Sequence, residues 1–127
     1  MSATNPSHTA VETIVEAYVA SWNETDPARR RAAIDRAWCD HGCYRDPLMS
    51  SDGPVALDAM LVAVQAKFPG FVLNRSSPID HHNGAMRFAW SLGPAGGPPI
   101  VEGVDFCTLS SDGRLASVVG FIDRMAD

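Results

Sequence analysis

The first half of the chain carries hydrophobic residues with the period of a helix. One apolar stripe consists of Val11, Ile14, Val15, Tyr18, Val19 and Trp22, which predicts a helix ending near Asn23. A second helix is predicted from Asp26-Pro27 to His41-Gly42, because Asp caps helices and Pro suits the first helical position. A third is predicted over about 55–67. Its inward side is expected to carry Leu57, Met60, Leu61, Val64 and Phe68.

From Phe71 onward the hydrophobic period changes to two, which is typical of strands. We predict a short extended piece before the third helix and four longer strands after it, at about 43–46, 71–82, 85–93, 100–109 and 114–123. Asn83-Gly84 is a hairpin signal. Helices followed by a meander of strands predict an α+β fold, with an antiparallel sheet and helices on one of its faces.

The last predicted strand is apolar on both of its faces. Leu115 and Val119 are expected on one face, with Val118, Gly120 and Ile122 on the other. A sheet whose second face is also apolar often buries that face against another copy. The sequence therefore predicts a homodimer formed through the outer face of the sheet.

Composition narrows the class of protein. The 127 residues suffice for one domain, and 46% apolar content is ordinary for a globular chain, which excludes a disordered, coiled-coil or collagen-like protein. Ten Lys/Arg against fifteen Asp/Glu give a net charge of −5, so neither nucleic acid nor a membrane is an expected partner. Three cysteines favour a reducing compartment. The polar residues 1–10 lack a signal-peptide pattern, and we expect a soluble cytoplasmic protein.

Asp105 is the most unusual polar residue in the pattern. It shares a strand face with Val101 and Cys107, which would otherwise belong to the core. A carboxylate there costs several kcal/mol unless it is paired or kept neutral. A neutral carboxyl is a hydrogen-bond donor that could stabilise an oxyanion or enolate. The alternative is a structural Asp that an Arg or backbone N–H groups satisfy.

Asp46 and Tyr18 are two further candidates. Asp46 ends the short extended piece immediately before Pro47, where it could act as a general base at the edge of a cavity. The alternative is an ordinary turn residue before proline. Tyr18 lies on the apolar stripe of the first helix, so its hydroxyl points inward and needs a partner. The alternative is plain core packing.

These three residues, in this order of elements, resemble a known family pattern. Over about residues 8–124 the chain resembles the nuclear transport factor 2-like superfamily, also called SnoaL-like or cystatin-like, and within it the ketosteroid isomerases. The matching positions are Tyr18, Asp46-Pro47, and Asp105 ahead of Asp112-Gly113-Arg114. The resemblance implies a single domain over 1–127, with three N-terminal helices packed in the concave face of a curved antiparallel sheet. It also implies a deep apolar pocket.

The resemblance further implies roles for these residues. Tyr18 and a neutral Asp105 would donate hydrogen bonds to a dienolate oxygen, and Asp46 would shuttle the proton. The stretch Gly84–Phe88 is similar to the family's pocket strand. The expected pocket lining is Trp22, Trp38, Tyr44, Met60, Val64, Phe68, Met86, Phe88, Trp90, Val101, Gly103, Cys107, Val118, Gly120 and Ile122. No cofactor is implied.

The sequence departs from the isomerases around the expected pocket. Trp38, Met60 and Leu61 stand where those enzymes have further tyrosines, and Trp90 and Gly103 stand where aliphatic residues are expected. Two functions therefore stay open. One is a cofactor-free isomerase-like or polyketide cyclase-like enzyme that transfers a proton next to the carbonyl of a small apolar compound. The other is a non-catalytic small-ligand-binding or dimerisation module.

The remaining polar groups have structural explanations. Cys39, His41 and Cys43 fall short of the four ligands usual for zinc, and His81 and His82 would point to opposite sheet faces, so no metal site is predicted. Arg29–Arg31 are expected on a solvated helix face.

Glu102 lies on the outward face of its predicted strand. We expect it to pair with Arg87 on the neighbouring strand.

Overall fold

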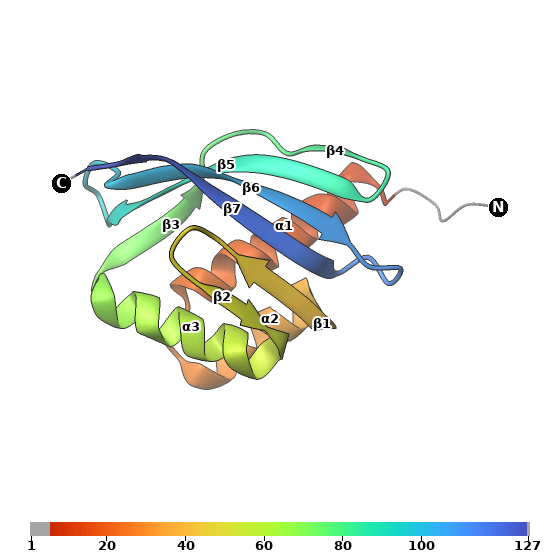
Figure 1. The fold of residues 1–127 in the computed structure, drawn as a ribbon, viewed down its shortest axis with the longest axis horizontal. Coiled ribbons are helices and arrows are strands. Elements are labelled where there is room, and N and C mark those ends of the chain that lie inside the picture. The colour runs from red at the N-terminus through yellow and green to blue at the C-terminus, as the bar shows by residue number, and fades with distance from the viewer. Residues whose placement is uncertain (1–5, 127) are drawn as a thin grey trace.

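The computed structural model describes residues 6–126. Residues 1–5 and 127 lie outside the described part, and with them half of the stretch examined for a signal peptide. The helices are α1 (His8–Asn23), α2 (Pro27–Ala37) and α3 (Gly53–Lys67). The strands are β1 (Trp38–Arg45), β2 (Ser50–Asp52), β3 (Phe71–Arg75), β4 (Asp80–His82), β5 (Ala85–Pro94), β6 (Val101–Leu109) and β7 (Leu115–Met125) (Figure 1). None of the three helices is long and apolar enough to cross a membrane.

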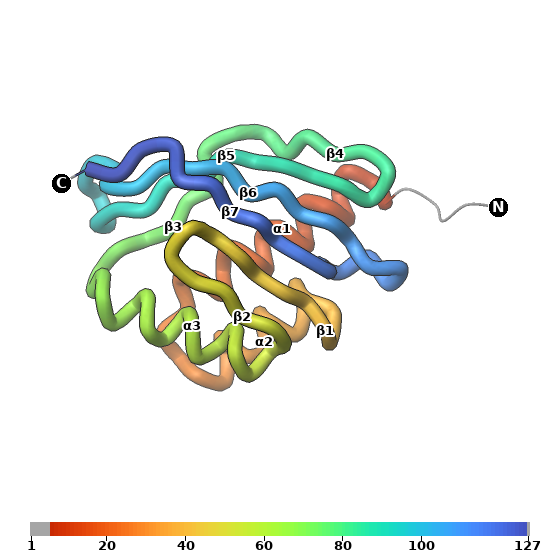
Figure 2. Tube along the Cα trace, viewed as in Figure 1, coloured from red at the N-terminus to blue at the C-terminus, as the bar shows by residue number. Residues whose placement is uncertain are grey.

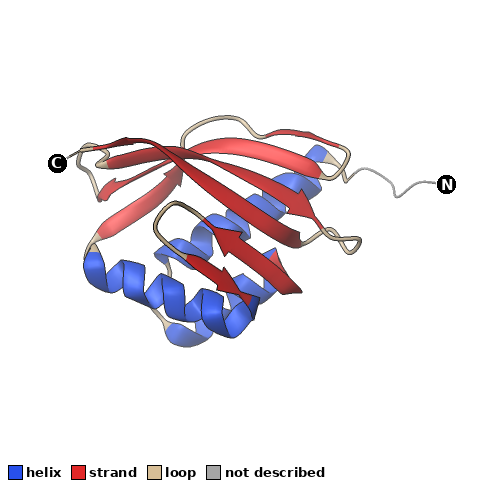
Figure 3. Cartoon of the chain, in the orientation of Figure 1, coloured by secondary structure: helices blue, strands red, loops and turns tan. Residues whose placement is uncertain are grey.

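The predicted α+β class is confirmed. The sheet curls over the three helices, which lie together on its concave side (Figure 3). Its strand order is β2-β1-β7-β6-β5-β3, with β4 paired to β5. One pairing differs from an antiparallel sheet, because β1 runs parallel to β7. These two strands are far apart in the sequence, so no hairpin imposes an antiparallel direction on them.

Local signals explain where the first two helices begin. The Ser7 hydroxyl caps α1 by accepting from the backbone N–H of Ala10, and the Asp26 carboxylate caps α2 as predicted. The end of α2 was predicted too late. The helix stops at Ala37, because Trp38 turns into extended backbone (φ −111°, ψ 144°) and begins β1. The extended conformation is preferred over a longer helix from Trp38 on, because the strand pairs with β7 and buries Trp38, Gly42 and Tyr44.

The predicted strand over 71–82 is divided into β3 and β4. Pro78 lies in the gap, and it has no N–H to donate to a strand ladder. The Asn83-Gly84 hairpin is confirmed as the turn between β4 and β5.

The predicted faces of the last strand were partly wrong. The β6–β7 register shifts between Thr108 and Leu109, which brings both Leu115 and Val118 onto the concave, buried face. Val119 lies on the opposite, convex face, so it does not share a face with Leu115. Simple alternation fails here because each extra residue in one strand reverses the side on which its successors point.

Arg30 is buried, in contrast to the solvated face predicted for residues 29–31. Its side chain lies between α2 and α3, where Nε donates to Asp58 at 2.7 Å. Its terminal nitrogen donates to the backbone carbonyls of Glu24 and Thr25. The guanidinium therefore joins the α1–α2 connection to α3. Figure 2 traces the backbone of α2 and α3.

The expected pair of Glu102 with Arg87 is not formed. Glu102 pairs with Arg124 on β7, and Arg87 pairs with Asp80 on β4 at 3.2 Å. The β5–β6 register explains this result, since it places Arg87 opposite Phe106 and Glu102 opposite Ser91.

Candidate functional site

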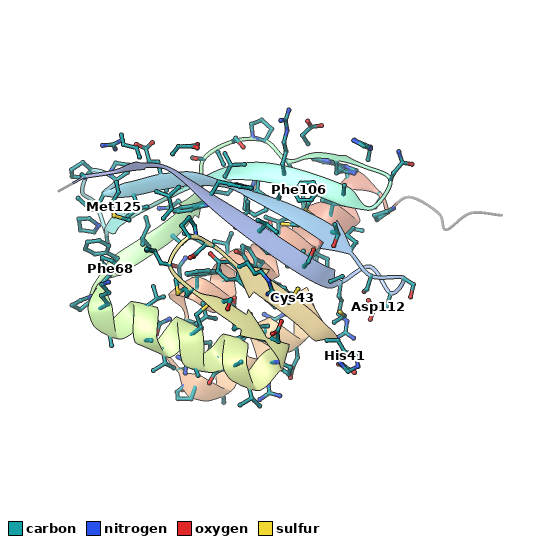
Figure 4. All side chains as sticks on the ribbon, in the orientation of Figure 1. His41, Cys43, Phe68, Phe106, Asp112 and Met125 are labelled. Carbon is teal, nitrogen blue, oxygen red and sulfur yellow. The ribbon has the colours of Figure 1, made fainter. Side chains whose placement is uncertain are left out.

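An apolar cavity lies between the concave face of the sheet and the helices α1 and α3. Its volume is about 60 Å³, which holds a few water molecules. Its lining consists of Tyr18, Trp22, Tyr44, Asp46, Leu48, Met49, Val64, Phe68, Leu73, Trp90, Leu92, Val101, Asp105, Ile122 and Met125. Phe68 and Met125 lie at the same end of the molecule, where α3 and the last strand end (Figure 4). Leu48 and Met125 are well exposed and form part of the rim.

The three polar residues singled out in the sequence, Tyr18, Asp46 and Asp105, all line this one cavity. Of the residues expected to line a pocket, the cavity includes Trp22, Tyr44, Val64, Phe68, Trp90, Val101 and Ile122. The others are buried in the core outside the lining: Trp38, Met60, Met86, Phe88, Gly103, Cys107, Val118 and Gly120.

Five lining residues were not anticipated: Leu48, Met49, Leu73, Leu92 and Met125. Leu48 and Met49 belong to the turn between β1 and β2. The sequence of this turn does not indicate that it lies over a cavity. Met125 faces the cavity because the β6–β7 register shifts a second time, between Glu102 and Gly103, and so pairs Met125 with Val101.

Asp105 is 2% exposed and receives two hydrogen bonds from side chains. The Tyr18 hydroxyl donates to Oδ2 at 2.7 Å, and the Trp90 indole Nε1 donates to Oδ1 at 3.0 Å. Among residues 6–126, neither an Arg nor a backbone N–H donates to this carboxyl, unlike the structural alternative considered from the sequence. Each oxygen instead has one neutral aromatic donor.

Burial raises the pKa of Asp105 from 3.8 to about 7. The hydrogen bonds from Tyr18 and Trp90 act in the opposite direction, and the charge of Asp46 raises the pKa further. Burial also raises the pKa of Tyr18 well above 10, so its hydroxyl keeps its proton. Asp105 therefore exchanges between its neutral and ionised forms close to neutral pH, as a general acid or base requires.

Asp46 stabilises a turn and also lines the cavity. Its Oδ1 accepts from the backbone N–H groups of Leu48 and Met49 at 2.7 and 2.9 Å, so the carboxylate holds the turn between β1 and β2. Its Oδ2 accepts from the Tyr44 hydroxyl at 2.7 Å, on the side of the cavity. The turn interpretation and the cavity interpretation of this residue are therefore compatible.

Gly120 on β7 lies next to the side chains of both Asp105 and Asp46. A Cβ atom built at this position would lie 3.0 Å from Oδ1 of Asp105, 3.2 Å from the Tyr44 hydroxyl oxygen and 3.3 Å from Cβ of Asp46. Any side chain larger than hydrogen would push these groups apart. The glycine thus lets Asp105, Tyr44 and Asp46 approach the same small volume.

Sequence reasoning missed the roles of Trp90 and Tyr44 as hydrogen-bond donors. Both are aromatic residues at core-facing strand positions, where apolar packing is the usual function. The pairing of β5 with β6 could have indicated the role of Trp90. Its register places Gly103 directly opposite Trp90, and it places Asp105 opposite Phe88, two residues along the strand. The indole can then cross the strand above the glycine and reach the carboxyl.

Across residues 6–126 no group of three His, Cys, Asp or Glu side chains is placed to hold a metal ion. The described cysteines, Cys39, Cys43 and Cys107, are free, and burial raises the pKa of the Cys107 thiol. The two carboxyl groups that line the apolar cavity, those of Asp105 and Asp46, are groups that can donate or accept a proton.

A curled sheet around three helices, with such a cavity at one end, defines the cone of the NTF2-like, or cystatin-like, proteins. No family model matches the sequence, and no curated protein matches it. The structure superposes with a TM-score of 0.84 on a candidate isomerase of the SnoaL-like family from Agrobacterium tumefaciens. The two are 38% identical, and the match covers 91% of this chain and 98% of the other. The chain belongs to the SnoaL-like family.

More distant relatives share the fold. A candidate polyketide cyclase from Sinorhizobium meliloti is 16% identical, with a TM-score of 0.69, over 91% of this chain and 99% of its own. A candidate SnoaL-like polyketide cyclase from Jannaschia is 17% identical, with a TM-score of 0.70, over 94% and 91% of the two chains.

Proposed function

We propose that this protein is a cofactor-independent enzyme that transfers a proton at the carbon next to a carbonyl group in a small apolar compound. The observation that carries the proposal is Asp105, a buried carboxyl with a pKa near 7 that faces an apolar cavity shared with a second carboxyl, Asp46. The names of the relatives, candidate isomerases and polyketide cyclases, agree with chemistry through an enolate.

The hydrogen bonds favour Asp105 as the general base. Its two oxygens accept from Tyr18 and Trp90, which orients the ionised form toward the cavity. The carboxylate takes the proton of the substrate's C–H bond, and the electron pair of that bond moves onto the carbonyl oxygen as an enolate. The Tyr44 hydroxyl lines the cavity and donates to Asp46 in the free protein, so it would stabilise the enolate oxygen only after releasing that hydrogen bond. Return of the proton from Asp105 to another carbon gives an isomer. Attack of the enolate carbon on a second carbonyl of the same molecule gives a ring, and the new alkoxide oxygen takes the proton from Asp105.

The roles implied by the ketosteroid isomerases are the reverse, with Asp46 as base and with Tyr18 and a neutral Asp105 as donors. The two assignments predict opposite pH profiles. If Asp105 is the base, the rate rises as the pH increases through about 7, since the ionised form is active. If a neutral Asp105 is the donor, the rate falls over the same range.

The test is exchange of deuterium into small ketones, followed by NMR. We expect Asp105→Asn to lower the rate by roughly a hundredfold or more, which is the usual contribution of a general base. Asp46→Asn is tested beside it, and if it alone abolished the rate, the roles would be those of the isomerases. Asp40→Asn serves as control, because the Asp40 side chain is 88% exposed and outside the cavity. Equal rates for wild type and Asp105→Asn would refute the proposal.

A second function, ligand binding without chemistry, is favoured by the small volume that Trp22 and Trp90 leave in the cavity. A pure binding protein would bind the same ketones with similar affinity before and after Asp105→Asn. It would catalyse no exchange in either form. Titration of each protein with a ketone, followed by NMR, separates this function from the first.

We also propose a homodimer formed through the convex face of the sheet. Phe106 and Phe121 are 43% and 54% exposed there, and each lies opposite a valine on the neighbouring strand, Val119 and Val104 respectively. Four adjoining apolar side chains form a patch typical of an interface. Phe106→Glu is expected to give a monomer in light scattering, whereas Val55→Glu, at an exposed apolar position on α3, is expected to leave the dimer intact. A monomeric wild type at micromolar concentration would overturn this proposal.

A further inference from the structure

We propose that Trp90, seated against Gly103, sets the size limit of the site and restricts its substrates to those that present an acyclic carbonyl-bearing end. Rings, and fused rings above all, stay outside. The chemical step rests on the function proposed above, whereas the size limit is a property of binding. The inference starts from the contacts of the indole.

The Trp90 indole lies across the backbone of β6. A Cβ atom at Gly103, its cross-strand partner, would lie 2.6 Å from Cζ2 and 3.0 Å from Cε2 of the indole. It would also lie 2.1 Å from the carbonyl oxygen of Phe121. The absence of a side chain at Gly103 is therefore what allows the indole to occupy this place.

The indole is also held from its polar edge. Its Nε1–H donates to Oδ1 of Asp105 at 3.0 Å, and the residue is only 8% exposed. The ring cannot swing away without breaking its hydrogen bond to a buried carboxyl. Packing against Gly103 and bonding to Asp105 together make Trp90 a fixed wall rather than an adaptable one.

A second aromatic cluster lines the cavity. Trp22 makes edge contacts with Tyr18 and Tyr44, with ring centres 6.2 and 5.6 Å apart. The whole cavity, which Trp22 and Trp90 both line, has a volume of about 60 Å³. Apolar cavities that take up benzene measure roughly 150 Å³. A six-membered ring is therefore too large for the space beside Asp105, while a short carbonyl-bearing chain fits it.

The rim sets no comparable limit on the rest of the ligand. Leu48 and Met125 are 65% and 49% exposed, so a longer substrate can extend past them into solvent. The substrate class is thus defined by its reacting end and not by its total length.

Binding of ketones of graded size tests the size limit. The probes are 2,4-pentanedione, cyclohexanone and 2-tetralone, and the readout is the shift of the Trp90 indole N–H in NMR, or of the Tyr18 ring resonances in Trp90 variants. Wild type is expected to bind 2,4-pentanedione and to exclude 2-tetralone. Trp90→Leu is expected to gain affinity for 2-tetralone by roughly tenfold or more, as is common when a hydrophobic pocket gains room. Trp38→Phe changes a buried tryptophan outside the lining and is expected to leave the preference unchanged.

A second variant covers the case in which Trp90→Leu does not fold. Trp90→Phe retains an aromatic ring but has no N–H, and it is expected to admit cyclohexanone while still excluding 2-tetralone. The proposal is overturned if wild type binds 2-tetralone as tightly as 2,4-pentanedione, or if neither Trp90 variant shifts the preference. If the size series holds but no ketone undergoes exchange, the proposed enzymatic function fails and the size limit stands. If exchange occurs equally on all three ketones, the size limit fails and the proposed enzymatic function stands.

Discussion

Replacement of Asp105 by asparagine tests the energetics of the site without any knowledge of the substrate. Asn preserves the shape of the side chain, and its amide can satisfy both neighbours: the oxygen accepts from the Trp90 indole, while the NH₂ donates to the Tyr18 hydroxyl oxygen. What the variant lacks is a titrating group. Its free energy of unfolding should therefore lack one pH-dependent contribution that the wild type has.

The magnitude follows from the shift in pKa. The folded protein holds the Asp105 proton up to about pH 7, whereas in the unfolded chain the proton leaves near 3.8. The folded state thus binds more protons between these values, and its stability falls as the pH rises. The stabilisation from protonated Asp105 is fully present below about pH 4 and is lost by the time the pH has passed 7. A shift of about three pH units corresponds to about 4 kcal/mol.

The assay is urea unfolding of wild type and Asp105→Asn at a series of pH values from 4 to 8. Titrating groups that do not interact with Asp105 contribute equally to both proteins, so the difference between the two free energies reports Asp105 and its coupling to Asp46. We expect the wild type to lose about 4 kcal/mol relative to the variant over this range. If the free energy of unfolding of wild type minus that of the variant stayed constant or rose with pH, the conclusion that folding raises the pKa of Asp105 would be refuted. Asp40→Asn, which removes a carboxyl at an exposed position outside the cavity, is the matched control.

Three further outcomes are expected. Gly120→Ala places a methyl group against Asp105, and it should lower the free energy of unfolding in urea by about 1–3 kcal/mol, as overpacking does; no loss would mean that the carboxyls have room to separate. Tyr18→Phe removes the hydroxyl donor and should move the midpoint of the Asp105 carboxyl titration in NMR above 7; a lower midpoint would contradict the role of that hydrogen bond. Arg30→Ala should lower the free energy of unfolding, measured by thermal unfolding, by about 2–3 kcal/mol, since it removes a buried side chain and its charged hydrogen bond to Asp58, whereas Arg31→Ala should change it by less than about 0.5 kcal/mol; equal effects would show that burial is irrelevant.

The helices and the order of elements could be predicted because periodicity and capping are local properties. Asp26 caps α2 where the sequence indicated, and Asn83-Gly84 forms the hairpin turn. The faces of β7 could not be predicted in full, because the two register shifts depend on how β7 pairs with β6. Nothing near Ser117 or Asp123 distinguishes a strand with bulges from a regular one.

The polar members of the cavity could be predicted from two local features. Asp105 and Tyr18 each place a polar group at a core-facing position, and Asp46 ends an extended piece before Pro47; all three line the cavity. The same criterion cannot find Trp90, since a tryptophan on a core-facing position fits the pattern. It also misassigned Arg30, because a charge run looks solvated until another helix covers one of its members. Residues that act through a long-range partner are visible only once the partner is in place.

The parallel pairing of β1 with β7 affects the order in which the molecule assembles. Tyr44 pairs with Val118, so the strand that leads to Asp46 has no neighbour on that side until β7 has been synthesised. Until then β1 and β6 each present an edge of unpaired backbone N–H and C=O groups, at which nascent chains can associate with one another. Closing so long a loop is also slow compared with forming the local contacts of α1 and α2. We therefore expect the cavity and its carboxyl pair to form late in folding.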